Sequence, residues 1–317
     1  MKNIFVYIAA LLIILMLFLP LISIKDSKAE ENKTQIEEIS LENEKSFKVL
    51  ITETDEIKEI SANDYIFGVV AAEMPALYSE EALKAQAVAA YTYALRRKQD
   101  NKDKGYDITD SPDSDQHYIS FDAAKEKWGE KAEEYTAKIK NVVASVEGEY
   151  IAFSGEPILA LYHSCSGGKT EDAKDVFSQE LPYLVSVDSS LDIMDKDYSC
   201  EQRFLVQEFS SLLEKSVNFS GEAAGWIKEI KHRGNGYVES VTVCDKTFSG
   251  TDFRKIFSLR SANFNIKFDN GFVFSVRGYG HGVGLSQSGA EQMAKQGGTY
   301  KEILLWYYKN TEILKKN

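Results

Sequence analysis

The sequence predicts an α+β fold, with mixed sheets and helices in one compact unit. Segments with the alternating apolar pattern of strands lie among segments with the apolar spacing of helices. The two kinds do not alternate regularly, as they would in a doubly wound parallel sheet. In addition, 44% of the 317 residues are apolar, which is enough to bury a sizeable core. No internal repeat or low-complexity tract interrupts this pattern.

The N-terminus predicts a transmembrane helix that precedes this unit. Residues 4–24 carry no charge, and 21 residues at ~1.5 Å rise per residue span the core of a bilayer. A cleaved signal peptide is the alternative, with Ser27-Lys28-Ala29 as its cleavage site, but the apolar run is longer than usual for one. We therefore expect an uncleaved anchor at 1–24, an acidic tether at 25–46 and an extracytoplasmic folded unit at 47–317.

The folded unit is expected to contain these elements in chain order: a strand at 47–51, a helix ending near Glu73, a long helix from Ser79 to about Lys98, a helix at 122–146, strands across 149–164 with a turn at 155–157, a helical region at 204–232 broken at Gly221, strands at 237–243 and 272–276, and helices at 286–295 and 300–308.

The first two helices have clear end signals. Asn63 or Asp64 is expected to cap the first, and Pro75 ends it because the residue before a proline avoids helical geometry. The second begins with acids at 80–81 and ends with bases at 96–98, which complements the helix dipole. Its apolar residues occupy most of the circumference, so it is expected to be central.

Charge and cysteine usage exclude some classes of function. The net charge is −12, from 49 acids and 37 bases, which argues against binding to nucleic acid or tightly to anionic lipid. The three cysteines, Cys165, Cys200 and Cys244, are too few for a disulfide framework, although one bridge is possible.

Glu73 is the first candidate for chemistry. It lies at a helix C-terminus beside Val69 and Val70, where the helix dipole and apolar neighbours both disfavour the charged carboxylate. Both effects raise a pKa, as a general acid near neutral pH requires. A surface glutamate at a helix end is the alternative, and spacing alone favours it.

Two further segments are candidates for ligand contacts. Residues 163–171 end a strand in a polar loop, where a Cys165–His163 nucleophile pair is conceivable but has no evident orienting acid. Residues 278–284 place glycine at every second position, which lets the backbone approach a ligand or another strand closely. His281 would then contact substrate, or it would be hydrogen bonded inside a tight strand crossing.

Together these segments resemble the stage II sporulation protein D and amidase-enhancer family over about residues 47–315. The matching stretches are Tyr65 through Arg97, His163-Ser164 with Gly167-Gly168 and Thr170-Glu171, Pro182-Tyr183-Leu184, and Gly278 through Ala290 continuing to Tyr307-Tyr308. Each motif alone is common, but four in this order are specific.

The resemblance implies a peptidoglycan lytic transglycosylase. Such enzymes cleave the β-1,4 bond between N-acetylmuramic acid and N-acetylglucosamine and leave a 1,6-anhydro end. In the sporulation branch the substrate is glycan without stem peptides, and the activity supports engulfment of the forespore. The implied partners are glycan strands, an amidase and a membrane protein of an engulfment complex. The implied location is the cell membrane, on the mother-cell side of the septal space. The family's other branch implies the alternative, a non-catalytic amidase enhancer or scaffold.

The family's catalytic glutamate maps onto Glu73. The side chains expected to bind substrate are His163, Ser164, Ser166, Tyr183, Asp192 and His281. Tyr183 would stack on a sugar ring and Asp192 would accept hydrogen bonds from hydroxyls. The loops at 163–170 and 278–284 are expected to form opposite walls around Glu73.

The chain departs from the family pattern at two places. Tyr91 stands where relatives commonly have arginine. The segment at 106–118, where some members bind zinc, contains His117 but no cysteine, so no metal and no cofactor is expected.

Overall fold

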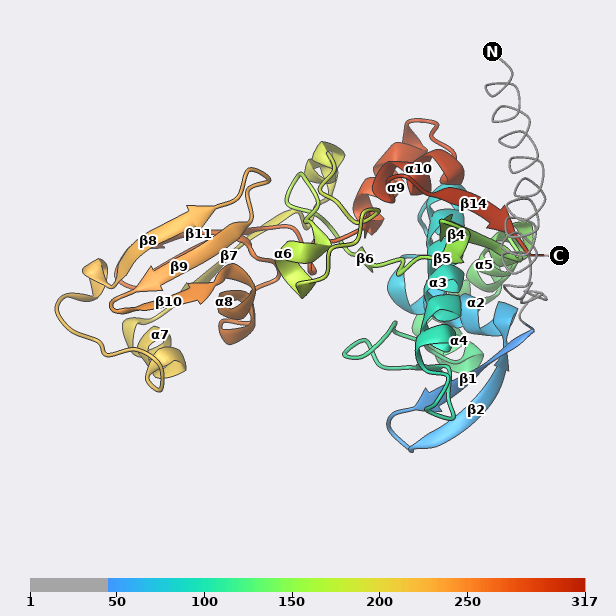
Figure 1. The fold of residues 1–317 in the computed structure, drawn as a ribbon, viewed down its shortest axis with the longest axis horizontal. Helices are drawn as coiled ribbons and strands as arrows, with labels where there is room; N and C mark the ends of the chain where they lie inside the picture. The colour runs from blue at the N-terminus through green and yellow to red at the C-terminus, as the bar shows by residue number, and fades with distance from the viewer. Residues whose placement is uncertain (1–44, 317) are drawn as a thin grey trace, which may run out of the picture. The chain divides into compact units, whose positions relative to one another are not determined.

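The computed structural model describes residues 45–316, whose helices and small sheets surround two separate hydrophobic cores (Figure 1). The predicted anchor at 1–24 and the predicted tether up to residue 44 lie outside this range, so the transmembrane prediction stays a prediction. Among the described residues, no helix combines the length and the apolar character needed to span a bilayer. The architecture is a mixture of helices and small sheets, which confirms the α+β class.

Helix α3 (Glu80–Asp100) is the centre of the larger hydrophobic core, as its sequence predicts. It packs against α2 (Ala62–Glu73), α5 (Ala132–Ser145), α9 (Gln287–Lys295), α10 (Tyr300–Tyr307) and the strand β4 (Glu149–Phe153). Six alanines between Ala82 and Ala94 are buried along it, and such small side chains permit close packing on several faces. Helix α3 thereby fixes α2 and α9, both of which contribute side chains to the site described below.

Two three-stranded sheets border this core. In the first, β1 (Ser46–Ile51) pairs antiparallel with β2 (Glu56–Ser61) and parallel with β3 (Ile108–Thr109). In the second, β4 pairs antiparallel with both β5 (Glu156–Pro157) and β14 (Glu312–Lys315). The last strand of the chain therefore completes a sheet begun near its middle.

A second core is formed by residues from the 199–277 region. One sheet has the order β11 (Asn263–Phe268), β12 (Phe272–Arg277), β7 (Ser199–Phe204), and the other has the order β10 (Lys246–Ser249), β9 (Val238–Val243), β8 (Ile227–His232). Helices α7 (Val206–Leu213) and α8 (Gly250–Ile256) contribute Phe209 and Phe253 to this core. The rings of Phe209 and Phe272 stack with centroids 3.8 Å apart. Aromatic packing thus dominates this second core.

The segments between the cores contain short elements. Strand β6 (Tyr162–His163) pairs parallel with β13 (Leu285–Ser286). Between them in sequence lie the helix α6 (Ala173–Phe177) and the 3₁₀ turn η2 (Ser190–Met194). The β6–β13 pair places two stretches that are 123 residues apart in sequence next to each other.

Two predicted helices were wrong in extent. Residues 204–232 are helical only at Val206–Leu213 and in the short 3₁₀ turn Ala223–Gly225, and Ile227–His232 is strand β8. A bulge between Ile227 and Glu229 shifts the register, so Ile227 and Ile230 both pack on the second core although their spacing resembles a helix. The predicted helix at 122–146 is divided at Gly129, whose φ of 53° is a left-handed conformation that glycine adopts without strain.

Candidate functional site

Helix α2 places Glu73 at its C-terminal end. The helix begins two or three residues earlier than expected, because Ser61 caps it and accepts a hydrogen bond from the Asp64 backbone N–H at 3.1 Å. Pro75 holds Met74 in an extended conformation, so the helix ends at Glu73 as predicted. The sequence therefore fixes the position of Glu73 through a cap at one end and a proline at the other.

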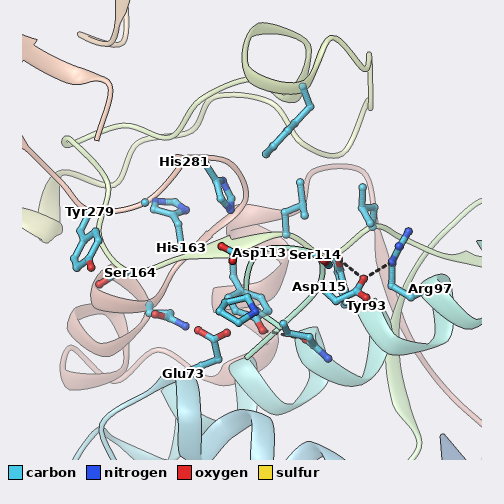
Figure 2. A pocket seen from close by; sticks show the side chains of 18 of the residues that line it. Glu73, Tyr93, Arg97, Asp113, Ser114, Asp115, His163, Ser164, Tyr279 and His281 are labelled. Atoms are coloured by element: carbon cyan, nitrogen blue, oxygen red, sulfur yellow. Dashed lines mark hydrogen bonds and ion pairs between the residues drawn. The ribbon is translucent and has the colours of Figure 1, made fainter. Parts of the chain in front are cut away.

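Glu73 lines a cavity of about 750 Å³ (Figure 2). Its lining residues are Glu73, Tyr93, Arg97, Pro112, Asp113, Ser114, Asp115, Gln116, Leu159, Leu161, Tyr162, His163, Ser164, Phe177, Gln179, Tyr279, Gly280, His281 and Gln287. The cavity brings Glu73 together with His163, Ser164 and His281, four of the seven predicted site residues. A cavity of this size with a few convergent polar groups is typical of a ligand-binding site.

Several groups surround the half-buried carboxylate of Glu73. Its Oε1 accepts a hydrogen bond from the His117 backbone N–H at 2.9 Å, and the side chains of Gln287 and Tyr162 also contact it. Burial raises the pKa of Glu73 above its ordinary value, and these hydrogen bonds offset part of the increase. The direction is the one predicted from sequence, and it favours a group that still holds its proton near neutral pH.

Lys127 completes this end of helix α2. Its Nζ donates to the carbonyls of Ala71 and Ala72 at 2.9 and 3.3 Å, so an ammonium group satisfies the last carbonyls of the helix. Burial lowers the pKa of Lys127, while the nearby Glu73 opposes that shift. Lys127 thus acts on the helix end rather than as a direct ion-pair partner of Glu73.

The loops at 163–170 and 278–284 do not form opposite walls, which corrects the prediction. They pair with each other: the Cys165 N–H donates to the Tyr279 carbonyl at 3.0 Å, and the Tyr279 N–H donates back to Cys165 at 2.7 Å. Together they form one side of the cavity, and the 112–116 segment lines another (Figure 2).

The alternating glycines make this pairing possible. Gly280 and Gly284 have φ of 112° and 75°, which side-chain-bearing residues rarely adopt. A Cβ atom on Gly280 would lie 2.8 Å from the His163 Cβ, and one on Gly284 would lie 2.0 Å from the Leu161 carbonyl oxygen. The glycines therefore permit a tight strand crossing, and the same crossing brings His281 to the cavity.

Val283 fixes the two cavity histidines in opposite tautomers. Its carbonyl lies 3.1 Å from His163 Nδ1, which must therefore carry the proton, since a carbonyl only accepts. Its N–H donates to His281 Nδ1 at 3.1 Å, so the His281 proton is on Nε2. Burial lowers the pKa of His163 to about 3 and that of His281 to about 4. Both rings are neutral near pH 7, with centroids 5.7 Å apart.

Ser166, Tyr183 and Asp192 do not line this cavity, which corrects their assignment as sugar contacts. Asp192 is fully buried and accepts hydrogen bonds from the Ser166 N–H and from the hydroxyls of Ser166, Ser189 and Ser286. The Tyr183 hydroxyl accepts from the Leu159 N–H at 3.2 Å. These residues hold the wall of the cavity together rather than facing its space.

No sequence signal pointed directly to the other lining residues. Gln116 and Tyr162 are hydrogen bonded to each other, and Gln287 reaches Glu73 from the first turn of α9. Asp115 is committed to Arg97 at 2.6 Å and to the Thr109 N–H at 2.9 Å. Asp113 is an exposed carboxylate at the rim. Only the N-cap residue Ser286, which begins α9, could have indicated Gln287 as a candidate.

Within residues 45–316, no group of three or more His, Cys, Asp or Glu side chains could hold a metal ion. The three cysteines are free thiols, and Cys165 is buried beside Asp192. Burial raises the pKa of the Cys165 thiol, which disfavours the thiolate that a nucleophile requires. Tyr91 is buried in the larger core.

Comparison with known proteins agrees with the resemblance noted above. A family model described as stage II sporulation protein matches residues 51–153. The chain is 37% identical over 275 residues to stage II sporulation protein D of Bacillus subtilis (strain 168), covering 84% of this chain and 78% of that protein. It is 34% identical over 273 residues to the protein of the same name from Bacillus amyloliquefaciens, with the same coverage. It is also 26% identical over 298 residues to the amidase enhancer of Bacillus subtilis (strain 168), covering 78% of this chain and 40% of that protein. The chain therefore belongs to the stage II sporulation protein D family.

Proposed function

We propose that this chain is a peptidoglycan lytic transglycosylase that uses Glu73 as its acid and acts on stem-peptide-free glycan during forespore engulfment. The observation that carries the proposal is a half-buried glutamate with a raised pKa, set in a cavity with neutral histidines and a serine. The name of the Bacillus relatives supports a role in sporulation.

One carboxylate is sufficient for the proposed reaction. Glu73 gives its proton to the glycosidic oxygen as the bond to the anomeric carbon of N-acetylmuramic acid breaks. The 6-hydroxyl of the same sugar attacks that carbon and its proton passes to the Glu73 carboxylate, which regenerates the acid. The product carries a 1,6-anhydro ring, and no water is consumed.

A second carboxylate would instead indicate hydrolysis, in which a base activates water. Asp115 is a poor candidate, because its carboxylate is bound by Arg97 and 1% of its side chain is exposed. Asp113 is exposed at the rim and has no such ion pair among the described contacts. Asp113 is therefore the residue on which a hydrolytic mechanism would depend.

A non-catalytic amidase enhancer or scaffold is the second candidate. The similarity to the Bacillus amidase enhancer favours it. In that case the cavity would bind glycan and an amidase would do the cutting. We further propose that residues 1–24 anchor the chain in the membrane and that residues 47–317 lie on the mother-cell side of the septal space. Retention of the full-length protein in the membrane fraction after a carbonate wash tests the anchor, and a mature N-terminus near Glu30 contradicts it.

Product analysis separates the three activities. The purified protein and its Asp113→Asn variant are incubated with glycan strands that lack stem peptides, and the products are weighed by mass spectrometry. Anhydro ends from both proteins support the transglycosylase. Products heavier by one water, lost in Asp113→Asn, indicate a hydrolase. Intact strands with both proteins leave the amidase enhancer or scaffold.

A further inference from the structure

We propose that Arg260 selects stem-peptide-free glycan by binding the lactyl carboxylate of its muramic acid residues, with Tyr279 holding the guanidinium in place. The inference rests on the proposed function, because it concerns how the same cavity recognises its substrate. It assigns Arg260 as a specificity-determining residue and Tyr279 as a positioning residue.

Tyr279 is a fixed aromatic residue on the wall of the cavity. Its backbone N–H donates to the Cys165 carbonyl at 2.7 Å, and its carbonyl accepts from the Cys165 N–H at 3.0 Å. The residue lines the cavity that contains Glu73, and 49% of it is exposed. Figure 2 shows the Tyr279 ring beside Ser164 on this wall. A group that is held by this ring is therefore held at the edge of the cavity.

The guanidinium of Arg260 lies over this ring. Its Cζ is 4.7 Å from the ring centroid of Tyr279, which is a cation–π contact. The Arg260 carbonyl also accepts from the N–H of Gly280, another cavity residue, at 2.9 Å. Stacking uses the face of a guanidinium, so the N–H donors in its plane stay free for a ligand. No residue in the described part of the chain accepts a hydrogen bond from these donors.

Arg97 cannot bind a carboxylate in the same way. It is the only arginine or lysine among the lining residues, all of which belong to the described range. Its Nε lies 2.6 Å from Asp115 and its Nη1 lies 3.5 Å from Asp100, so two carboxylates already neutralise its charge. These two would repel a third carboxylate on a ligand. An anionic group of the substrate is therefore expected at Tyr279 and not at Arg97.

Arg260 belongs to a group of three arginines without acid partners. Four of the seven arginines in residues 45–316 form ion pairs, and Arg254, Arg260 and Arg277 do not. Arg254 Nε donates to the Leu259 carbonyl at 3.2 Å, and the Arg277 carbonyl accepts from the Ser261 hydroxyl, so both contact the neighbours of Arg260. In a chain with a net charge of −12, this local excess of positive charge favours an anionic ligand.

The lactyl group of muramic acid supplies such an anion. It ends in a carboxylate when the stem peptide has been removed and in an amide when the peptide is attached. A guanidinium binds a carboxylate through two parallel charge-assisted hydrogen bonds, which an uncharged amide cannot form. Arg260 therefore favours strands without stem peptides. N-acetylglucosamine has no lactyl group, so this contact also distinguishes the two sugars of the strand.

The test compares the binding of two end-labelled glycan strands by fluorescence anisotropy. One strand has free lactyl carboxylates, and in the other the carboxylates are converted to methylamides. Glu73→Gln protein is used so that the strands stay intact, at ~0.15 M salt, where charges beyond ~8 Å are largely screened. The carboxylate strand should bind about tenfold more tightly, because charge-assisted hydrogen bonds contribute about 1.5–3 kcal/mol and 1.4 kcal/mol corresponds to tenfold.

Arg260→Gln, added to the Glu73→Gln protein, should weaken binding of the carboxylate strand about tenfold and leave the methylamide strand unchanged. Arg260→Lys should keep part of the preference, since it keeps the charge but loses the planar fork. Tyr279→Leu should also reduce the preference, because the guanidinium loses the ring that orients it. Arg203→Gln is the matched control: Arg203 is an exposed arginine that pairs with Asp269, and its loss should leave both affinities unchanged.

Equal affinity of the two strands for the Glu73→Gln protein overturns the proposal, and so does a lack of binding to the carboxylate strand. An equal loss for both strands in Arg260→Gln overturns it as well, because Arg260 would then support the wall without contacting the carboxylate. The comparison of strands needs no change at position 260, so it decides the matter even if Arg260→Gln does not fold.

Binding is measured without cleavage, so this outcome is separable from that of the proposed function. A preference for the carboxylate strand in a protein whose wild type cleaves nothing supports the role of Arg260 and refutes the activity. Equal cleavage and equal binding of the two strands support the activity and refute the role of Arg260.

Discussion

Replacing Asp192 by alanine should destabilise the protein strongly while leaving the Glu73 carboxylate in place. The four groups that donate to Asp192 are the Ser166 N–H and the hydroxyls of Ser166, Ser189 and Ser286. They come from the loop after β6, from the chain before η2 and from the cap of α9. One buried carboxylate thus joins three segments of the cavity wall.

The magnitude follows from what the substitution leaves unpaired. Each buried donor without an acceptor costs ~1–3 kcal/mol, and the Ser189 hydroxyl keeps a partner in Tyr307 at 2.7 Å. We therefore expect a loss of about 3–5 kcal/mol in the free energy of unfolding, in the range measured for breaking buried charged networks. For a domain of this size that corresponds to a fall in Tm of about 6–20 °C.

Asp192→Asn should cost less, about 1–3 kcal/mol, because one amide oxygen can still accept from most of the donors. The Ser286 hydroxyl is the exception. It donates its proton to Asp192 Oδ1 and accepts a hydrogen bond from the Gly289 N–H. If the amide nitrogen of Asn takes the place of Oδ1, the Ser286 proton has no acceptor. Denaturant unfolding measures both variants against Asp103→Ala, an exposed control. Unchanged stability in Asp192→Ala, together with a tenfold higher KM for glycan, would show that Asp192 contacts sugar. It would also show that Asp192 does not hold the cavity wall together.

Three further predictions concern pH, the second histidine and metals. Burial raises the pKa of Glu171 from 4.5 to about 7, so stability falls as pH rises through this window. Glu171→Gln should remove that fall, as denaturant unfolding at pH values on both sides of the window would show. His281→Ala should lower glycan turnover at least tenfold but cost only about 1 kcal/mol of stability, because the Val283 N–H loses its acceptor. Cleavage should survive treatment with a chelator, and an activity abolished by it and restored by zinc would contradict the metal-independent account.

Structure could be predicted from the sequence where a local signal has one structural meaning. Pro75 keeps the residue before it out of helical geometry, which predicted that Glu73 lies at the C-terminus of α2. The apolar circumference of 80–98 likewise indicated a central helix, and α3 is one. In both cases the relevant physics lies within a few residues of the chain.

Structure could not be predicted from the sequence where contacts between distant segments determine it. Ile227 and Ile230 have helical spacing, but pairing with β9 and a bulge make them a strand. Asp192 is a polar residue that sequence alone cannot distinguish from a ligand contact, and only the assembled fold shows three serines around it. Gln116 and Tyr162 line the same cavity as Glu73 only because segments about 40 to 90 residues apart fold together, so no spacing rule could have grouped them.

The most direct test of the central claim is the cleavage rate of Glu73→Gln on stem-peptide-free glycan. Glutamine keeps the size of the side chain and cannot give a proton to the glycosidic oxygen. The account predicts a folded protein whose rate falls by at least ~10²-fold, since general acid catalysis contributes ~10²–10⁴-fold. Glu133→Gln, an exposed substitution in the first turn of α5, should retain the full rate. A Glu73→Gln protein that keeps more than half of the wild-type rate would remove Glu73 from the mechanism.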